Sequence, residues 1–175
     1  FTIDEAALLH NLEVLRGVKE RTGCRILLAQ KAYSAFATYP VISRYLDGTT
    51  ASGLYEARLG KTYFGGETHV FSPAYKEDEF TELLSYADHF VFNSPSQVKK
   101  YAPRARAAGK SCGLRVNPEC STQDGHAIYD PCAPLSRLGT TLANFDESIL
   151  PLLDGLHFTL CEQNSDALET TVDAF

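Results

Sequence analysis

The sequence predicts an α/β fold built around a parallel sheet. Short apolar runs, typical of buried strands, alternate with longer segments that have helical periodicity. The first strands begin about every twenty residues, which leaves room for one helix between neighbouring strands. Right-handed crossovers then leave two layouts, a doubly wound open sheet and a (β/α)8 barrel. No glycine-rich phosphate loop follows the first strand, and this favours the barrel.

Capping and turn residues place the elements in order. Asp4 is a candidate N-cap for a helix that runs to about Arg21 and ends at Gly23. Proline suits the first turn of a helix, so Pro40 and Pro95 mark two further starts. The other expected helices cover residues 55–59, 76–86, 149–153 and 164–175, and the expected strands cover residues 26–30, 48–52, 69–72, 89–92, 112–116 and 155–160.

Roughly six strands are fewer than the eight that a closed barrel requires. We therefore expect residues 1–175 to form a single incomplete (β/α)8 barrel domain, the N-terminal part of a longer barrel enzyme. No Pro/Gly/Ser-rich linker divides the chain. No apolar run is long enough to span a bilayer, and Phe1 does not begin a signal-peptide pattern, so no membrane partner is expected.

Charge and cysteine content narrow the possible partners. The formal net charge of -6 argues against binding to nucleic acid and is weakly compatible with a cationic small substrate. The five cysteines are widely spaced without a Cys-x-x-Cys motif, which argues against disulfides and favours a cytoplasmic location. We expect no metal site from the sequence. His10, His69, His89 and His126 have no recognisable partners in the pattern, so they receive no role.

Lys31 is the most informative residue for function. It follows an apolar strand directly, where a lysine is costly to desolvate. Such a lysine either extends to water beyond the strand end or forms a Schiff base with a carbonyl cofactor such as pyridoxal phosphate (PLP). In barrels the functional groups gather at the C-terminal ends of strands. The other candidates there are Ser52, Ser72, Asn93, Arg115, Asn117 and the segment 157–164.

Several longer motifs resemble one family of enzymes. They are Leu28-Ala29-Gln30-Lys31-Ala32-Tyr33-Ser34, Thr49-Thr50-Ala51-Ser52-Gly53-Leu54-Tyr55-Glu56, Phe71-Ser72-Pro73-Ala74-Tyr75-Lys76, Gly113-Leu114-Arg115-Val116-Asn117-Pro118-Glu119, Ser136-Arg137-Leu138-Gly139 and Leu160-Cys161-Glu162-Gln163-Asn164-Ser165-Asp166-Ala167-Leu168. They are similar to the PLP-dependent decarboxylases of the alanine racemase fold type, and within these to the carboxynorspermidine (carboxyspermidine) decarboxylases. The resemblance covers essentially the whole chain.

The resemblance implies an enzyme of polyamine biosynthesis and a role for each matching residue. Lys31 matches the lysine that forms the Schiff base with pyridoxal 5'-phosphate. Glu56, Arg115 and Cys161 match positions near the cofactor, and Arg137 and Glu162 match positions near the substrate. The substrate would be a carboxylated polyamine, and the active site would be completed across a homodimer interface. A C-terminal β-domain would lie beyond Phe175.

One position departs from the family pattern. Related decarboxylases carry a cofactor-stacking histidine after the phenylalanine of the last strand, whereas here Phe158 is followed directly by Thr159. By alternation we expect His157 to face the opposite side from such a histidine, so it is not given that role. Either the histidine is absent, which would weaken cofactor binding, or one residue is missing from the sequence at this point. We favour the second, because deletion of a residue within the strand would turn every later side chain to the other face. Three alternatives stay open, namely a diaminopimelate or ornithine decarboxylase-like enzyme or racemase, a non-catalytic PLP-binding protein, and a fragment that binds nothing.

Overall fold

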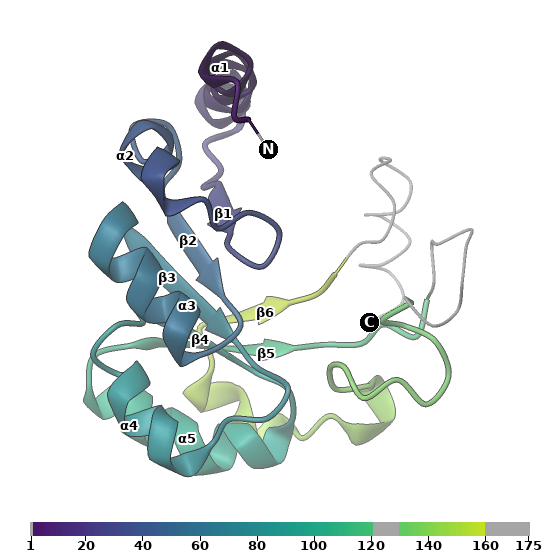
Figure 1. Cartoon of the computed structure of the whole chain (residues 1–175). Coiled ribbons are helices and arrows are strands. Elements are labelled where there is room, and N and C mark those ends of the chain that lie inside the picture. Colours follow the sequence, from purple (N-terminus) through teal and green to yellow (C-terminus); the bar gives the residue numbers. More distant parts are fainter. Residues whose placement is uncertain (1, 121–129, 160–175) are drawn as a thin grey trace. The chain divides into compact units, whose positions relative to one another are not determined.

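The computed structural model describes residues 2–120 and 130–159, in which helices and parallel strands alternate (Figure 1). The strands follow chain order in a six-stranded sheet, β1-β2-β3-β4-β5-β6. The chain divides into two compact units, residues 1–70 with 76–89 and residues 71–75 with 90–175. We call these unit 1 and unit 2 and describe each separately.

The strands are β1 (Leu27–Ala29), β2 (Gly48–Ala51), β3 (Glu67–Phe71), β4 (His89–Phe92), β5 (Ser111–Arg115) and β6 (Gly155–His157). The α-helices are α1 (Glu5–Thr22), α2 (Tyr39–Ile42), α3 (Leu54–Leu59), α4 (Glu77–Leu83) and α5 (Pro95–Ala107). Short 3-10 helices are η1 (Phe36–Thr38), η4 (Leu142–Asn144) and η5 (Glu147–Leu152), and η2 (Gly60–Phe64) is a π-helix.

The first helix of unit 1 has the caps that the sequence predicts. Asp4 Oδ1 accepts hydrogen bonds from the backbone N–H groups of Ala6 and Ala7, at 2.9 and 3.1 Å. At the other end Gly23 has a φ of 71°, a left-handed conformation that glycine adopts without strain. Helix α1 is thereby fixed at both ends, and it begins and ends within one residue of the predicted bounds.

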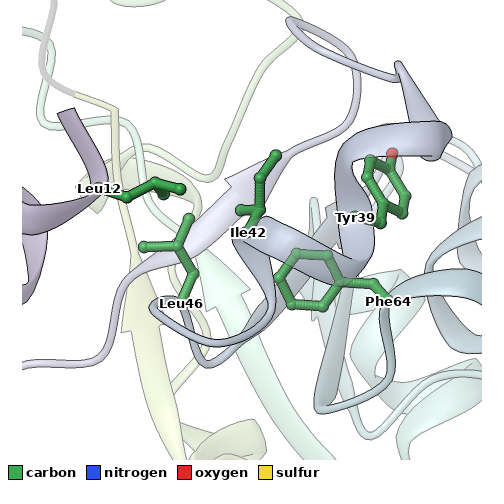
Figure 2. Packing of buried hydrophobic residues seen from close by; sticks show 5 residues of the cluster. All are labelled: Leu12, Tyr39, Ile42, Leu46 and Phe64. Atoms are coloured by element: carbon green, nitrogen blue, oxygen red, sulfur yellow. The ribbon is translucent and has the colours of Figure 1, made fainter. Parts of the chain in front are cut away.

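A small apolar core joins α1 to the helical segments that follow β1 and β2 (Figure 2). Leu12 of α1 packs with Tyr39 and Ile42 of α2, with Leu46, and with Phe64 of η2. The rings of Tyr39 and Phe64 meet edge to face, with centroids 5.5 Å apart, an orientation favoured by aromatic quadrupoles. This cluster packs α1, α2 and η2 against one another.

Helix α3 continues directly into the π-helix η2. The N–H of Gly65 donates to the carbonyl of Gly60 at 3.1 Å, five residues back, so the turn holds one residue more than an α-helical turn. Gly60 packs closely on the sheet, because a Cβ there would lie 2.3 Å from Thr49 Oγ1. Glycine at this position therefore lets the π-turn approach β2.

The framework of unit 2 consists of aromatic packing around α5 and a carboxylate at the start of β5. The Tyr101 hydroxyl donates to the carbonyl of Tyr75 at 3.2 Å, and the Tyr75 hydroxyl donates to the carbonyl of Val91 at 2.9 Å. Asp154 Oδ2 accepts from the Cys112 N–H at 2.8 Å, and its carboxylate also pairs with Arg106. These contacts fix β5 against α5 and the segment that leads into β6.

The expected order of strands and helices is confirmed, with differences at several ends. The apolar strand before Lys31 shortens to β1 and is only half-buried, because it lies at the end of the strand order. The helix expected at residues 149–153 is the 3-10 helix η5, in which Pro151 cannot donate an α-helical hydrogen bond. The expected helix at 164–175 lies outside the described residues. None of the helices described is long and apolar enough to cross a membrane.

Candidate active site

Lys31 lies in a tight turn just past the C-terminal end of β1. The N–H groups of Ala32 and Tyr33 both donate to the carbonyl of Ala29 at 3.0 Å, which turns the chain back after the strand. The Lys31 side chain is exposed among the described residues. The strand end that the sequence predicts for Lys31 is confirmed, whereas full burial of the preceding strand is not.

Gln30 connects this strand end to its neighbours in unit 1. Its side chain is buried, and Nε2 donates to the carbonyl of Glu56 at 2.9 Å and to that of Thr50 at 3.3 Å. Its Oε1 accepts from the buried Tyr39 hydroxyl at 3.2 Å. Burial raises the pKa of Tyr39, so this phenol stays protonated and donates. The Gln30 side chain therefore fixes the backbone next to Lys31 relative to β2 and α3.

Glu56 lies on α3, just beyond the end of β2. Its Oε2 accepts from the N–H of Ser52 at 2.6 Å, so the carboxylate folds back on the first turn of its own helix. Negative charge is favourable there because it faces the positive end of the helix dipole. Because β2 pairs with β1, the chain positions Glu56 and Lys31 at the ends of neighbouring strands. Whether Glu56 contacts a cofactor stays a prediction.

Arg115 ends β5 in unit 2 and is 7% exposed. Its guanidinium carbon lies 4.7 Å from the ring centre of Phe71, a cation–π contact. The His157 ring stacks on the same phenylalanine at 5.6 Å. Burial, and secondly the charge of Arg115, lower the pKa of His157 to about 4. These contacts give Arg115 the partner that a buried cation requires.

His157 lies next to Arg115 in the sheet. Arg115 and His157 are register partners in β5 and β6, and Phe71 contacts both, so His157 lies on the same face as Arg115. Strand β6 ends at His157, so the face of a histidine after Phe158, and with it the expectation that His157 faces the opposite side, stays a prediction.

Arg137 belongs to a segment that is anchored to the end of β4. Asn93 Nδ2 donates to the Arg137 carbonyl at 2.9 Å, and Asn93 Oδ1 accepts from the Gly139 N–H at 2.7 Å. Gly139 has a φ of 82°, and a Cβ there would lie 2.9 Å from the backbone of Val116. The Arg137 side chain is exposed, and its contact with a substrate stays a prediction. Cys161 and Glu162 lie outside the described residues.

A second polar group was missed by the sequence analysis. In unit 1, Glu67 Oε2 lies 3.2 Å from His69 Nε2 and 3.9 Å from His89 Nε2, and the two imidazole rings stack at 4.0 Å. Arg25 pairs with the other oxygen, Glu67 Oε1. Burial and the neighbouring His89 lower the pKa of His69 to about 4. The alternation of β3 could have placed Glu67 and His69 on one face, but the position of His89 depends on strand pairing.

Comparison with known proteins points to one group of enzymes. The chain is 39% identical over its whole length to the carboxynorspermidine/carboxyspermidine decarboxylase of Campylobacter jejuni, and 39% identical over 99% of its length to that of Herminiimonas arsenicoxydans. It is 34% identical to the carboxyaminopropylagmatine decarboxylase of Synechocystis. The chain is thus similar to decarboxylases of carboxylated polyamines. It covers 45%, 48% and 44% of these three relatives, so it spans about half of their length.

Solved structures agree with the sequence comparison. The carboxynorspermidine decarboxylase of Campylobacter jejuni, solved with norspermidine, matches with a TM-score of 0.82 at 37% identity, over 97% of this chain and 43% of that one. The alanine racemase of Corynebacterium glutamicum matches over 99% of this chain and 49% of that one, with a TM-score of 0.66 at 16% identity, which supports the fold alone. The predicted α/β barrel class is confirmed. No protein-family model matches the chain.

Proposed function

We propose that this chain is part of a PLP-dependent decarboxylase that acts on carboxynorspermidine or carboxyspermidine in polyamine biosynthesis. The observation that carries the proposal is the 39% identity, over the whole chain, to relatives that bear this name. The solved neighbour bound to norspermidine supports a polyamine-type ligand. The negative net charge of the chain is compatible with a polycationic substrate.

The described residues include groups of the kind that bind PLP. A primary amine is required for covalent attachment of PLP, and Lys31 presents one at a parallel strand end, with Glu56 held at the end of the neighbouring strand. Arg115 supplies a cation at the end of β5. When bound, PLP supplies the electron sink that decarboxylation needs.

The residues of this chain would then divide the work as follows. Lys31 Nζ would bind the cofactor covalently, and Gln30 would keep its strand end in place. Glu56, Arg115 and Cys161 would bind the cofactor, and Arg137 and Glu162 would bind the substrate. The protein's contribution is to orient the scissile bond and to exclude water. We further propose a cytoplasmic homodimer.

The decisive experiment is borohydride reduction of the full-length, PLP-loaded protein, followed by peptide mass mapping. We expect a reduced pyridoxyl adduct on Lys31. Lys31→Ala should lose the adduct and lower turnover by roughly three orders of magnitude or more, because the attachment atom is gone. Lys76→Ala is the control, since Lys76 is an exposed lysine that pairs with Glu79 in the first turn of α4. An active Lys31→Ala enzyme would overturn the proposal.

The relative named carboxyaminopropylagmatine decarboxylase favours a second candidate substrate. Its agmatine part ends in a guanidinium, which is planar and needs a different partner from an ammonium group. Steady-state kinetics with carboxynorspermidine, carboxyspermidine, carboxyaminopropylagmatine, ornithine and diaminopimelate would rank the candidates. A preference for ornithine or diaminopimelate would replace the proposed substrate class while leaving the role of Lys31 intact.

A further inference from the structure

The polar group in unit 1 has the composition of a metal site. Glu67 and His69 lie two residues apart on β3, so their side chains lie on one face of the strand. His89 begins β4 and brings its Nε2 to the same place. One potential ligand atom from each of the three residues lies within 4.8 Å of the other two.

We propose that Glu67, His69 and His89 bind a divalent transition-metal ion, in the first place zinc. A zinc ion takes imidazole nitrogen and carboxylate oxygen at about 2.0–2.2 Å, so tetrahedral ligand atoms stand about 3.3 Å apart. The distances of 3.2 and 3.9 Å from Glu67 Oε2 to the two imidazoles lie close to that spacing. Two imidazoles among three ligands favour zinc, nickel or copper over magnesium or calcium, which prefer oxygen.

The charges around the group set the expected strength of binding. Arg25 holds Glu67 Oε1, which orients the carboxylate and leaves Oε2 directed at the imidazoles. The guanidinium also repels a cation, so the affinity should be moderate rather than that of a four-cysteine site. Asp88, the nearby acid, is engaged by Lys61 and by the Thr68 N–H. The three ligand residues are half-buried.

The register of the sheet separates this site from the Lys31 end. His69 pairs with Thr50, and Thr50 pairs with Ala29, so His69 lies level with Ala29 across three strands. Lys31 lies two residues beyond Ala29, and Glu67 lies two residues before His69. The ion would thus lie toward the N-terminal ends of the strands, the end of a barrel associated with stability rather than catalysis. We therefore expect the ion to cross-link β3 and the start of β4 without taking part in turnover.

The test uses full-length protein after removal of metals with a chelator. Zinc binding is measured by competition with a chromophoric chelator, and thermal unfolding is measured with and without zinc. We expect one saturable ion per chain and a rise in Tm, because an ion that binds only the folded state stabilises it. His69→Gln and His89→Gln should each weaken binding at least tenfold and remove the Tm shift. His10→Gln, at an exposed position of α1, should change neither.

A spectroscopic measurement on the unaltered protein covers the case in which a variant does not fold. Cobalt in place of zinc should give the absorption of a site with nitrogen and oxygen ligands only. Absence of saturable binding, equal binding by all variants, or a cobalt–thiolate charge-transfer band from cysteine would overturn the proposal. Each of these results is independent of the borohydride experiment, because the site makes no use of Lys31 or PLP.

Discussion

Both units hold the ends of their strands with a glutamine, but under different conditions. In unit 1, Gln30 is buried and bonds to the carbonyls of Thr50 and Glu56 and to the Tyr39 hydroxyl. In unit 2, Gln97 is half-buried; its Nε2 donates to the Pro73 carbonyl at 2.7 Å, and its Oε1 accepts from the Asn93 N–H at 2.8 Å.

The two glutamines differ in how far their hydrogen-bond partners are shielded from water. The bonds from Gln30 to the two carbonyls and both bonds of Gln97 are partly buried, but the bond between Gln30 and the Tyr39 hydroxyl is fully shielded from solvent. An unsatisfied buried polar group costs more than a hydrogen bond gains. Hydrogen-bond length alone would rank Gln97 as the stronger clamp, while burial ranks Gln30 as the more costly to lose.

The largest effect should come from Gln30→Ala, which leaves two carbonyls and a phenol without this partner. We expect a loss of about 3 kcal/mol in the free energy of unfolding, measured in urea. Activity should fall as well if Lys31 has the proposed role, because its strand end loses its anchor. A loss no greater than that of Gln97→Ala would show that burial does not decide the cost.

The pH dependence of stability should depend on His157, a half-buried residue of unit 2. The pKa of His157 is lowered from 6.5 to about 4, so the unfolded chain takes up its proton first as the pH falls. Neutral His157 therefore contributes to the free energy of unfolding. This contribution is fully present above pH 6.5 and is lost as the pH falls toward 4, by on the order of 2 kcal/mol. In His157→Gln the pH dependence of urea unfolding should flatten over this range, and an unchanged profile would contradict the assignment.

Gln97→Ala is the matched counterpart of Gln30→Ala. We expect a loss of about 1 kcal/mol, since water can take over the Pro73 carbonyl and the Asn93 N–H. The same urea titration measures it. Because Asn93 also anchors the segment with Arg137, substrate KM should rise more than kcat falls if that arginine binds substrate. A kcat effect alone would argue against this role of Arg137.

The smallest effect should have the opposite sign. Thr68 is fully buried, and its hydroxyl has no hydrogen-bond partner among the described residues. Thr68→Val replaces the hydroxyl by a methyl group of similar size and keeps the backbone bond to Asp88. We expect a gain of about 0.5 kcal/mol in the free energy of unfolding. A loss in the same urea titration would indicate that the hydroxyl is bonded after all.

The sequence is sufficient to predict those elements whose signals are local. Asp4 and Gly23 cap α1, and the apolar run of β4 has the predicted bounds, because capping and strand propensity depend on neighbouring residues. Lys31 and Arg115 are found at strand ends for the same reason. The 3-10 geometry of η5 and the shortening of β1 depend on tertiary packing, which local patterns do not contain.

The parts that could not be predicted depend on how strands pair. Gln30 looks like a polar interruption of an apolar run until β2 and α3 bring their carbonyls to it. His69 and His89 are twenty residues apart in the chain, and only the arrangement of β3 and the start of β4 stacks their rings. Pairing register is set by the whole sheet. Sites assembled across strands are therefore visible only once the fold is known.

The π-turn at Gly60 has a consequence for how the chain tolerates changes in length. This turn contains one residue more than a regular α-helical turn would need in the connection from β2 to β3. Removing one residue from this turn would let it tighten into an α-helical turn, so the paired rows of β2 and β3 could stay aligned. In evolutionary terms the connection between β2 and β3 could lose one residue at this turn while the two strands keep their register.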